Sequence, residues 1–295
     1  EDAELVHNGT YYTNHRIFVG GLKEDGDYVK IKFNDKFPNS GRYSNIYLNL
    51  NLWIENAYEL IDEEGEWYLN RKDGFLYYKP RQWENLETAE ITLPTSEGLI
   101  EGSGSITDDK YEPIHNISFK DIDFAYTTVW NLFQQNGGLA IQQNATIYGP
   151  MQGGQQSSGN KILPAAVKLE NVSYIDFEGC SFKKIGGMAL AILGGIQHVD
   201  IDGNEFYDIS GNGVQIGMPK SAEVIGASLR PVQNDFFPLD KRYYKADIQI
   251  TNNYIHDTAV EFVSAGAMAV TNLQYSNISH NEIFWTSYSG IHAAF

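Results

Sequence analysis

A short pattern that returns five times constrains the fold of this chain more than any other feature. Each copy has an apolar residue, four mostly small or polar residues and another apolar residue: residues 119–124 (FKDIDF), 177–182 (FEGCSF), 201–206 (IDGNEF), 250–255 (ITNNYI) and 278–283 (ISHNEI). The copies start 58, 24, 49 and 28 residues apart, so two spacings hold one repeat and two hold a repeat with an insertion. A period of about 24 residues with Gly and Asn at the corners is typical of a solenoid, in which each coil buries its apolar edge by stacking on the next. The sequence therefore predicts an all-β, right-handed parallel β-helix.

Asparagine recurs at one position of this repeat, at Asn204, Asn253 and Asn281. In stacked coils these residues are expected to form a ladder inside a corner, with each amide bonded to the next. Asn also tolerates the left-handed backbone of a tight turn, and the two explanations are compatible.

The chain divides into two predicted parts. Residues 1–110 lack the repeat and are expected to form a small N-terminal antiparallel β subdomain packed on the first coils. The coils are expected over residues 111–295, with insertions at about 134–164 and 218–246. Both insertions leave the repeat near one corner, and long insertions in a solenoid usually carry function, so we expect them to wall a groove.

Within the N-terminal part, a hairpin is predicted over residues 66–80 around Asp73-Gly74. Further strands are expected over residues 46–50 and 89–93, and a short helix over residues 53–61.

The composition excludes several classes of binding partner. The formal net charge is −17, so the chain has no basic footprint for a nucleic acid or an anionic membrane. No apolar run approaches the roughly 18 residues of a membrane-spanning helix. The single cysteine, Cys180, excludes an intramolecular disulfide and a Cys-based zinc site. No cofactor is predicted.

The two ends lead to further expectations. The chain opens with EDAE and carries no signal peptide, which indicates a mature form or a fragment. It stops inside the Gly-led stretch 290–295 (GIHAAF) without a polar cap, so additional coils or chains are expected at the C-terminal end.

A pair of carboxylates is the leading catalytic candidate. The eighth position of the repeat holds Asp208 and Asp257, which stacking would place on adjacent coils at roughly 5 Å between backbones. Two carboxylates at that separation suit acid/base work on a glycosidic bond. Asp is also a favoured turn residue, and a stacked pair could instead hold a structural calcium or a shared proton. Glu261, in an enlarged coil after Asp257, is the third catalytic candidate.

Several other residues are candidate substrate contacts. His256 lies beside Asp257, although an imidazole next to a turn Asp is more often structural. His292 is aligned with Ala189, Gln215 and Met268 in a column expected to face solvent or the groove; with Tyr288 it could contact a sugar or be an ordinary surface residue. Aromatic residues in or beside the insertions could bind sugar faces or pin the loops: Trp130, Tyr148, Phe236, Phe237, Tyr243 and Tyr244.

Several motifs resemble a known family. They are residues 53–57 (WIENA), 65–69 (GEWYL), 76–80 (LYYKP), 210–217 (SGNGVQIG), 252–257 (NNYIHD), 279–283 (SHNEI) and 288–291 (YSGI). They are similar to the parallel β-helix proteins of bacterial carbohydrate degradation, and most of all to glycoside hydrolase family 141. The resemblance implies a secreted enzyme that cleaves xylan or fucosides. The family's catalytic aspartates are implied to follow the SGI strand and match no position here.

Three functions remain open at this stage. The first is a secreted, extracellular or periplasmic glycoside hydrolase, or its N-terminal portion, acting on a polysaccharide or oligosaccharide such as plant cell-wall xylan or a fucosylated glycan. The second is a polysaccharide lyase on the same scaffold, which the acidic charge disfavours. The third is a non-catalytic carbohydrate-binding or filament-forming β-solenoid.

Overall fold

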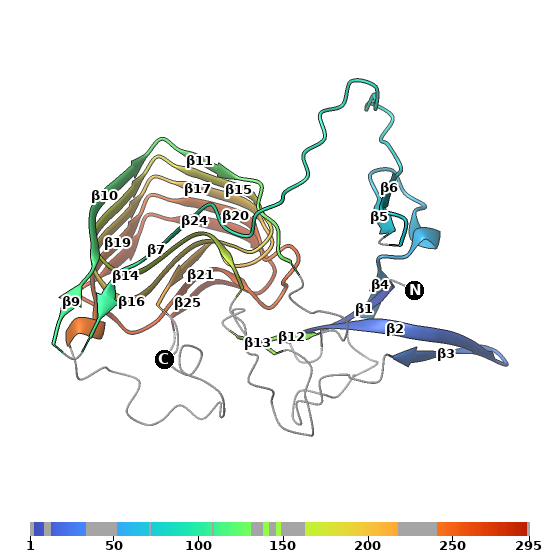
Figure 1. Ribbon diagram of the computed structural model, residues 1–295, viewed down its shortest axis with the longest axis horizontal. Coiled ribbons are helices and arrows are strands. Elements are labelled where there is room, and N and C mark those ends of the chain that lie inside the picture. The colour runs from blue at the N-terminus through green and yellow to red at the C-terminus, as the bar shows by residue number, and fades with distance from the viewer. Residues whose placement is uncertain are drawn as a thin grey trace. The chain divides into compact units, whose positions relative to one another are not determined.

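The structure, a computed structural model, describes residues 3–8, 13–33, 52–70, 72–107, 109–130, 138–141, 146–148, 163–217 and 241–293 (Figure 1). The chain forms two compact units. One comprises Glu1–Leu93 with Phe133–Leu139 and Tyr148–Gly159; the other comprises Pro94–Leu132, Ala140–Ile147 and Asn160–Phe295. The described residues contain strands and two short 3₁₀ turns, η2 (Tyr58–Leu60) and η5 (Lys241–Tyr243), and no α-helix.

An antiparallel sheet organises the first unit. Strand β1 (Glu4–His7) lies between β2 (Thr13–Asp25) and β4 (Leu52–Glu55). Leu5 and Ile17 face each other across β1 and β2 and are buried, which anchors the pairing. Strand β3 (Tyr28–Phe33) pairs with β2. The sheet also contains β12 (Gly138–Ile141) and β13 (Thr146–Tyr148).

The predicted hairpin is confirmed. Strands β5 (Trp67–Asn70) and β6 (Phe75–Tyr78) pair in antiparallel fashion around Asp73-Gly74. The Asp73 carboxylate accepts a hydrogen bond from the Phe75 amide at 2.9 Å, and Gly74 has φ +76°, which favours glycine in this turn.

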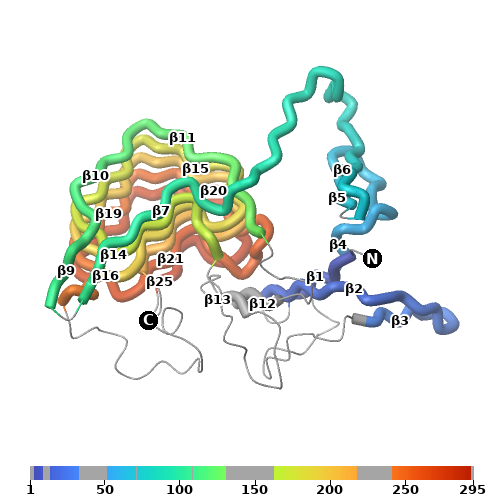
Figure 2. Tube along the Cα trace, in the orientation of Figure 1, coloured from blue at the N-terminus to red at the C-terminus, as the bar shows by residue number. Residues whose placement is uncertain are grey.

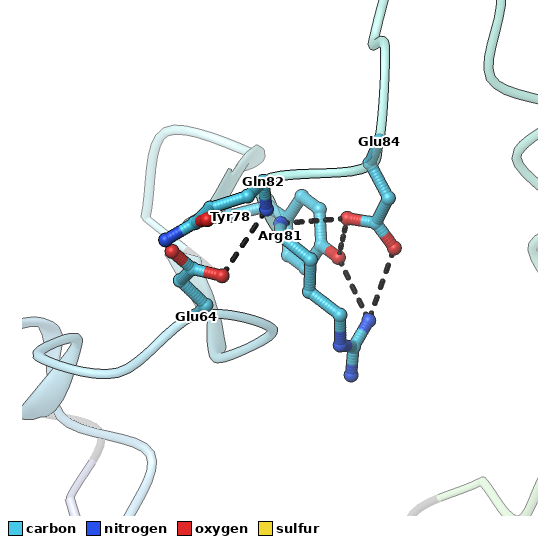
Figure 3. A network of polar contacts seen from close by, with 5 residues as sticks. All are labelled: Glu64, Tyr78, Arg81, Gln82 and Glu84. Carbon is cyan, nitrogen blue, oxygen red and sulfur yellow. Dashed lines mark hydrogen bonds and ion pairs between the residues drawn. The ribbon is translucent and has the colours of Figure 1, made fainter.

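A network of polar side chains follows this hairpin and connects it to the segment before it (Figure 3). The Glu84 carboxylate accepts hydrogen bonds from the Tyr78 hydroxyl, the Arg81 amide at 2.9 Å and the Arg81 guanidinium at 3.0 Å. The Gln82 amide donates to Glu64 at 3.1 Å. The hydroxyl and amide donors lower the pKa of Glu84, since both favour its charged form.

Two expectations for the N-terminal part are wrong. The predicted helix over 53–61 is strand β4 followed by η2, because Asn56 between them has φ 55° and interrupts a helix. Residues 89–93 form no strand, and Ile91 and Leu93 are largely exposed. The predicted strand 46–50 lies outside the described residues.

The second unit contains two sheets with parallel pairing from coil to coil (Figures 1 and 2). The larger sheet contains β7 (Ile100–Ser103), β10 (Ile114–Lys120), β14 (Ala165–Glu178), β16 (Met188–Asp202), β18 (Val214–Ile216), β19 (Lys245–Thr251), β21 (Gly266–Val270), β22 (Leu273–Gln274), β23 (Asn277–Ser279) and β25 (Ser289–Ala293). The smaller, five-stranded sheet contains β11 (Asp123–Ala125), β15 (Ser181–Ile185), β17 (Glu205–Ile209), β20 (Tyr254–Thr258) and β24 (Glu282–Thr286). A short antiparallel pair, β8 (Ser105–Ile106) with β9 (Tyr111–Glu112), completes the unit.

The register of these sheets confirms the predicted repeat. Ile201 pairs with Ile250, and Ile250 with Ile278. On earlier coils Phe119 pairs with Phe177, and Phe177 with Ile201. These residues therefore form one vertical column, as the spacing of the repeat requires, and the coils form a parallel β-helix.

The interior of the coils is built from stacked rings and aliphatic side chains. Phe124, Phe182 and Phe206 stack with 4.7 Å between successive ring centroids and are buried. The predicted asparagine ladder is also confirmed: the Asn253 amide oxygen accepts from the side chain of Asn204 at 3.0 Å, and the Asn281 oxygen from that of Asn253 at 2.9 Å. We call this buried column the Asn corner.

Left-handed backbone recurs at matching positions of successive coils, and two of these columns bear on the site. The first, which we call the terminal corner, lies near the end of the strands of the smaller sheet and contains Tyr126, Lys184, Asp208, Asp257 and Trp285, with φ of 47–63°. The second, the central corner, lies in the larger sheet and contains Asn116, Tyr174, His198, Asp247 and Tyr275, with φ of 50–56°. Residues other than Gly, Asn and Asp lose about 1–2 kcal/mol in this conformation, and both corners hold such residues, so the coil geometry rather than residue preference imposes them.

The coil-containing unit begins at Pro94, earlier than the predicted boundary at 110. The reason is β7, which pairs in parallel with β14 and so belongs to the coils. Most of the two predicted insertions, 134–164 and 218–246, lies outside the described residues, and so does the groove they were expected to wall.

Candidate functional site

The two leading carboxylates lie on adjacent coils. Strand β17 pairs with β20 so that Glu205 faces Tyr254 and Ile209 faces Thr258. The same register places Asp208 beside Asp257 in the terminal corner, as the repeat predicts. The left-handed backbone interrupts the inward–outward alternation of each strand here, and both side chains are about half exposed, at 52% and 47%.

Each carboxylate has a different nitrogen partner. Asp208 forms an ion pair with Lys184 of the preceding coil at 3.2 Å. The Asp257 carboxylate lies 2.8 Å from Nδ1 of His256. The pair is therefore held from two sides, by an ammonium on one coil and an imidazole on another.

His256 is held in a column of rings. Its imidazole stacks on Tyr207 with centroids 5.4 Å apart and on Phe284 with centroids 5.1 Å apart, and both ring pairs are within 5° of parallel. Its Nε2 lies 3.7 Å from the Glu205 carboxylate. The side chain of His256 is only 16% exposed. The imidazole thus bonds to the Asp257 carboxylate of its own coil, and its Nε2 has no hydrogen-bond partner among the described residues.

The rings continue at the surface beyond this column. Tyr254 contacts His256 and Phe284 at 4.7 and 5.3 Å, and Trp285 meets Phe284 edge-on at 4.8 Å. Tyr254 is 37% exposed and Trp285 is 74% exposed. We call this group, on the outward side of β17, β20 and β24, the ring cluster: Tyr207, Tyr254, His256, Phe284 and Trp285.

Most of the ring cluster was not predicted from the sequence. Strand alternation could have found it, since the buried Phe206, Ile255 and half-buried Ile283 point inward and their neighbours along each strand point outward. Reading the outward positions across coils places Tyr207, His256 and Phe284 in one column.

Glu261 lies on the same coil as Asp257, in the turn between β20 and β21, and is exposed. Tyr288, between β24 and β25, is half-buried.

The column predicted for His292 is wrong at two positions. Register gives Ala191, Gln215, Ala269 and His292, in place of Ala189 and Met268. The column is also not exposed as expected: Gln215 and Ala269 are 1% and 2% exposed. Burial lowers the pKa of His292 because desolvation penalises the charged imidazole.

Gln215 has both ends of its amide engaged within the coils. Its Oε1 accepts from Asn212 at 2.8 Å, and its Nε2 donates to the Gly217 carbonyl at 2.5 Å. These bonds give it a structural role and leave little capacity for substrate.

The two candidate aromatic residues beside the insertions lie elsewhere in the unit. The Trp130 amide donates to Glu97 at 2.6 Å, and its ring is 51% exposed. Tyr243 is the last residue of η5. The amide of Ile196, in β16, donates a hydrogen bond to the carbonyl of the following residue, Tyr244, at 2.9 Å, so η5 ends beside β16. Phe236 and Phe237 lie outside the described residues, and the side chain of Tyr148 is not described.

Among the described residues, no group of three or more His, Cys, Asp or Glu side chains is arranged to hold a metal ion. In the same part of the chain, no helix has the length and apolar character that crossing a membrane requires.

Comparison with known proteins identifies the fold family. A family model described as "Right handed beta helix region" matches residues 143–294, just over half of the 295 residues. The chain belongs to this family of right-handed β-helix proteins, which confirms the predicted fold class. No curated protein matches the chain.

A solved structure adds a link to carbohydrate chemistry. A protein named "Glycoside hydrolase" superposes with a TM-score of 0.74 and 25% sequence identity over 99% of this chain. The match covers 51% of that protein, so the present chain spans about half of its length.

Proposed function

We propose that this chain forms the β-helical part of a secreted glycoside hydrolase that acts on a polysaccharide. The observation that carries the proposal is the ring cluster beside the paired carboxylates Asp208 and Asp257. The similarity to a structure named glycoside hydrolase supports it, and so does the resemblance of several motifs to glycoside hydrolase family 141. The proposal includes secretion, because plant cell-wall polysaccharides lie outside cells.

The surface chemistry suits a sugar ring. Aromatic faces pack against the apolar C–H faces of sugars, and polar groups at their edge fix the hydroxyls. Tyr254 and Trp285 supply exposed rings. The carboxylates of Asp208 and Asp257 supply hydrogen-bond acceptors at the edge of the same face.

The carboxylate pair suits hydrolysis. Adjacent strands lie about 4.8 Å apart, and glycoside hydrolases use two carboxyl groups separated by about 5–5.5 Å for retention or about 6.5–9.5 Å for inversion. We propose Asp208 and Asp257 as the acid and the base or nucleophile, with Glu261 as the alternative to either. His256, bonded to Asp257, acts as a positioning residue, and Tyr288 is a proposed sugar contact.

The test is release of reducing ends from a panel of polysaccharides, with xylan and fucosylated glycans first. Asp208→Asn and Asp257→Asn are each expected to lower the rate by about 100-fold or more, since general acid–base groups contribute about 10²–10⁴-fold. Wild-type rates in both variants would remove these residues from the mechanism.

The chain offers a matched control in Asp247. It has the same backbone conformation, at φ 56°, its side chain is 53% exposed, and its carboxylate lies 2.6 Å from the imidazole of His198. It belongs to the central corner, away from the ring cluster. Asp247→Asn is expected to leave the rate within about twofold of wild type; an equal loss in this variant would point to folding rather than chemistry.

A further inference from the structure

The carboxylates around the ring cluster have few cations beside them. The three strands that carry the cluster are β17 (EFYDI), β20 (YIHDT) and β24 (EIFWT), and they contain no lysine or arginine. They carry four carboxylates: Glu205, Asp208, Asp257 and Glu282. Glu205 and Glu282 are exposed on the outward side, and the two aspartates are about half exposed.

The nearest lysines of the sheet are already engaged. Lys183 and Lys184 belong to β15, one coil before the cluster. Lys183 pairs with Asp123 at 2.9 Å and Lys184 with Asp208 at 3.2 Å. Among the described residues of this sheet, a ligand carboxylate on the ring cluster would therefore meet carboxylates and no lysine or arginine that is free of an ion pair.

This charge distribution selects between two classes of glycan. A polyuronate carries one carboxylate on each sugar, and like charges at contact distance repel each other even in water. An uncharged glycan avoids that repulsion, and its hydroxyl groups can donate hydrogen bonds to the carboxylates of Asp208 and Asp257.

We infer that the ring cluster takes a glycan that carries hydroxyl groups and no carboxylates, and that it rejects polyuronates. The inference rests on the proposed function and adds the substrate class. It assigns Glu205 and Glu282 as specificity determinants, because they place negative charge on the outward side beside Tyr207, Tyr254 and Phe284 without being among the proposed catalytic residues.

The experiment compares binding, so that it does not depend on hydrolysis. Calorimetry at low ionic strength measures the affinity of the full chain for neutral xylo-oligosaccharides and for oligogalacturonates of equal length. The neutral ligand is expected to bind at least tenfold more tightly. Tyr254→Ala is expected to weaken neutral binding by about tenfold, since loss of a stacking ring removes most of its contact.

Charge variants locate the selectivity. Glu282→Gln is expected to improve oligogalacturonate affinity about fivefold and Glu282→Lys by more, with both gains shrinking at high salt. Neutral binding should stay within about threefold. Glu178→Gln is the control, because Glu178 is exposed on β14 of the other sheet and should change neither affinity.

The outcomes separate this inference from the proposed function. Oligogalacturonate binding equal to or tighter than neutral binding, with or without added calcium, would overturn the inference while a glycan-binding function stands. Binding of neither ligand class would count against the proposed function itself. Unchanged oligogalacturonate affinity in Glu282→Lys would show that the selectivity lies outside the ring cluster.

Discussion

The Asn corner and the terminal corner run through the same coils, yet they differ in almost every respect. The Asn corner repeats one residue type, and Asn204 and Asn253 are 1% exposed. The terminal corner holds four residue types on five coils, from Tyr126 through Lys184, Asp208 and Asp257 to Trp285. Its side chains lie at the surface. A uniform, buried column holds the solenoid together, whereas a varied, exposed column is free to acquire chemistry.

The central corner refines this comparison, because it also contains a His–Asp pair. There the pair forms between coils, with His198 stacked on one ring, Tyr174, at 4.4 Å and 41% exposed. In the terminal corner the pair forms within one coil, and His256 lies between two rings at 16% exposure. The same two residue types therefore form an open His–Asp contact in one place and a fixed one in the other.

The largest effect is expected from the Asn corner. Asn253→Ala removes an amide that accepts bonds from the backbone and side chain of Asn204 and donates to Asn281 and to the Ile201 carbonyl. Buried groups left without partners cost about 1–3 kcal/mol each, so we expect a loss of about 3–5 kcal/mol in the free energy of unfolding. Asp257→Asn, at the exposed corner, should cost less than about 1 kcal/mol. Urea denaturation compares the two; equal losses would erase the distinction between the corners.

The next effect separates the two histidines. His256→Asn is expected to lower the free energy of unfolding by about 2 kcal/mol, because it removes two ring contacts worth about 0.5–1.5 kcal/mol each. His198→Asn should stay within about 0.5 kcal/mol, since Asn tolerates its left-handed backbone and the site is open.

A second substitution at the same position tests what His256 does. His256→Phe keeps the stack between Tyr207 and Phe284, so it should recover most of the stability. It removes the contact with Asp257, so the hydrolysis rate and its dependence on pH should still change. Full activity in His256→Phe would show that the imidazole only packs.

These contrasts show which parts of the fold and of the candidate site the sequence could predict. The repeat located Ile201, Ile250, Ile278 and the asparagine ladder because both depend on identical residues at a fixed position of the repeated motif. It also placed Asp208 beside Asp257, since the corner lies only a few residues past the repeated motif. The position of a residue relative to the repeated motif was sufficient in these cases.

The His292 column was misplaced because the Gly-led strands were aligned on their glycines. Those glycines lie at or next to the start of the strands, and they mark close approaches of the backbone at positions that differ in register from coil to coil. A Cβ on Gly187 would lie 2.2 Å from the Pro164 carbonyl oxygen, and one on Gly213 would lie 2.8 Å from that of Ala267. The ring cluster was missed for a different reason: its members share an outward position but no residue type, so no repeat reveals them.

A smaller effect concerns the backbone of the terminal corner. Asp208 has φ 54°, where Ala is disfavoured by about 1–2 kcal/mol and Gly is not. Gly loses part of this advantage through its greater freedom in the unfolded chain. We therefore expect Asp208→Gly to be more stable than Asp208→Ala by about 0.5–1 kcal/mol in thermal or urea unfolding. An Ala variant as stable as the Gly variant would mean that the corner can relax to negative φ.

The smallest effect belongs to the central corner, where carboxylates crowd together. Desolvation, followed by the charges of Asp176, Asp247 and Asp202, raises the pKa of Asp200 above its usual 3.8. Between the unfolded and folded pKa values the folded state holds more protons, so the stability due to this group falls as pH rises through that window. Asp200→Asn should therefore be more stable than wild type at pH near 7, and this advantage should vanish as pH falls below about 3.8.

Because Asp200 is exposed, solvent screening limits the gain from Asp200→Asn to about 0.5 kcal/mol. Unfolding midpoints measured near neutral pH and at the lowest pH where both proteins stay folded would detect it, and high salt should reduce it. Asp257→Asn is the useful contrast, because the Asp257 carboxylate has His256 as its partner rather than other carboxylates, and its loss should give no gain at neutral pH. A stabilising Asp257→Asn would mean that the terminal corner is under the same repulsion as the central one, and that its carboxylates are retained for function at a cost in stability.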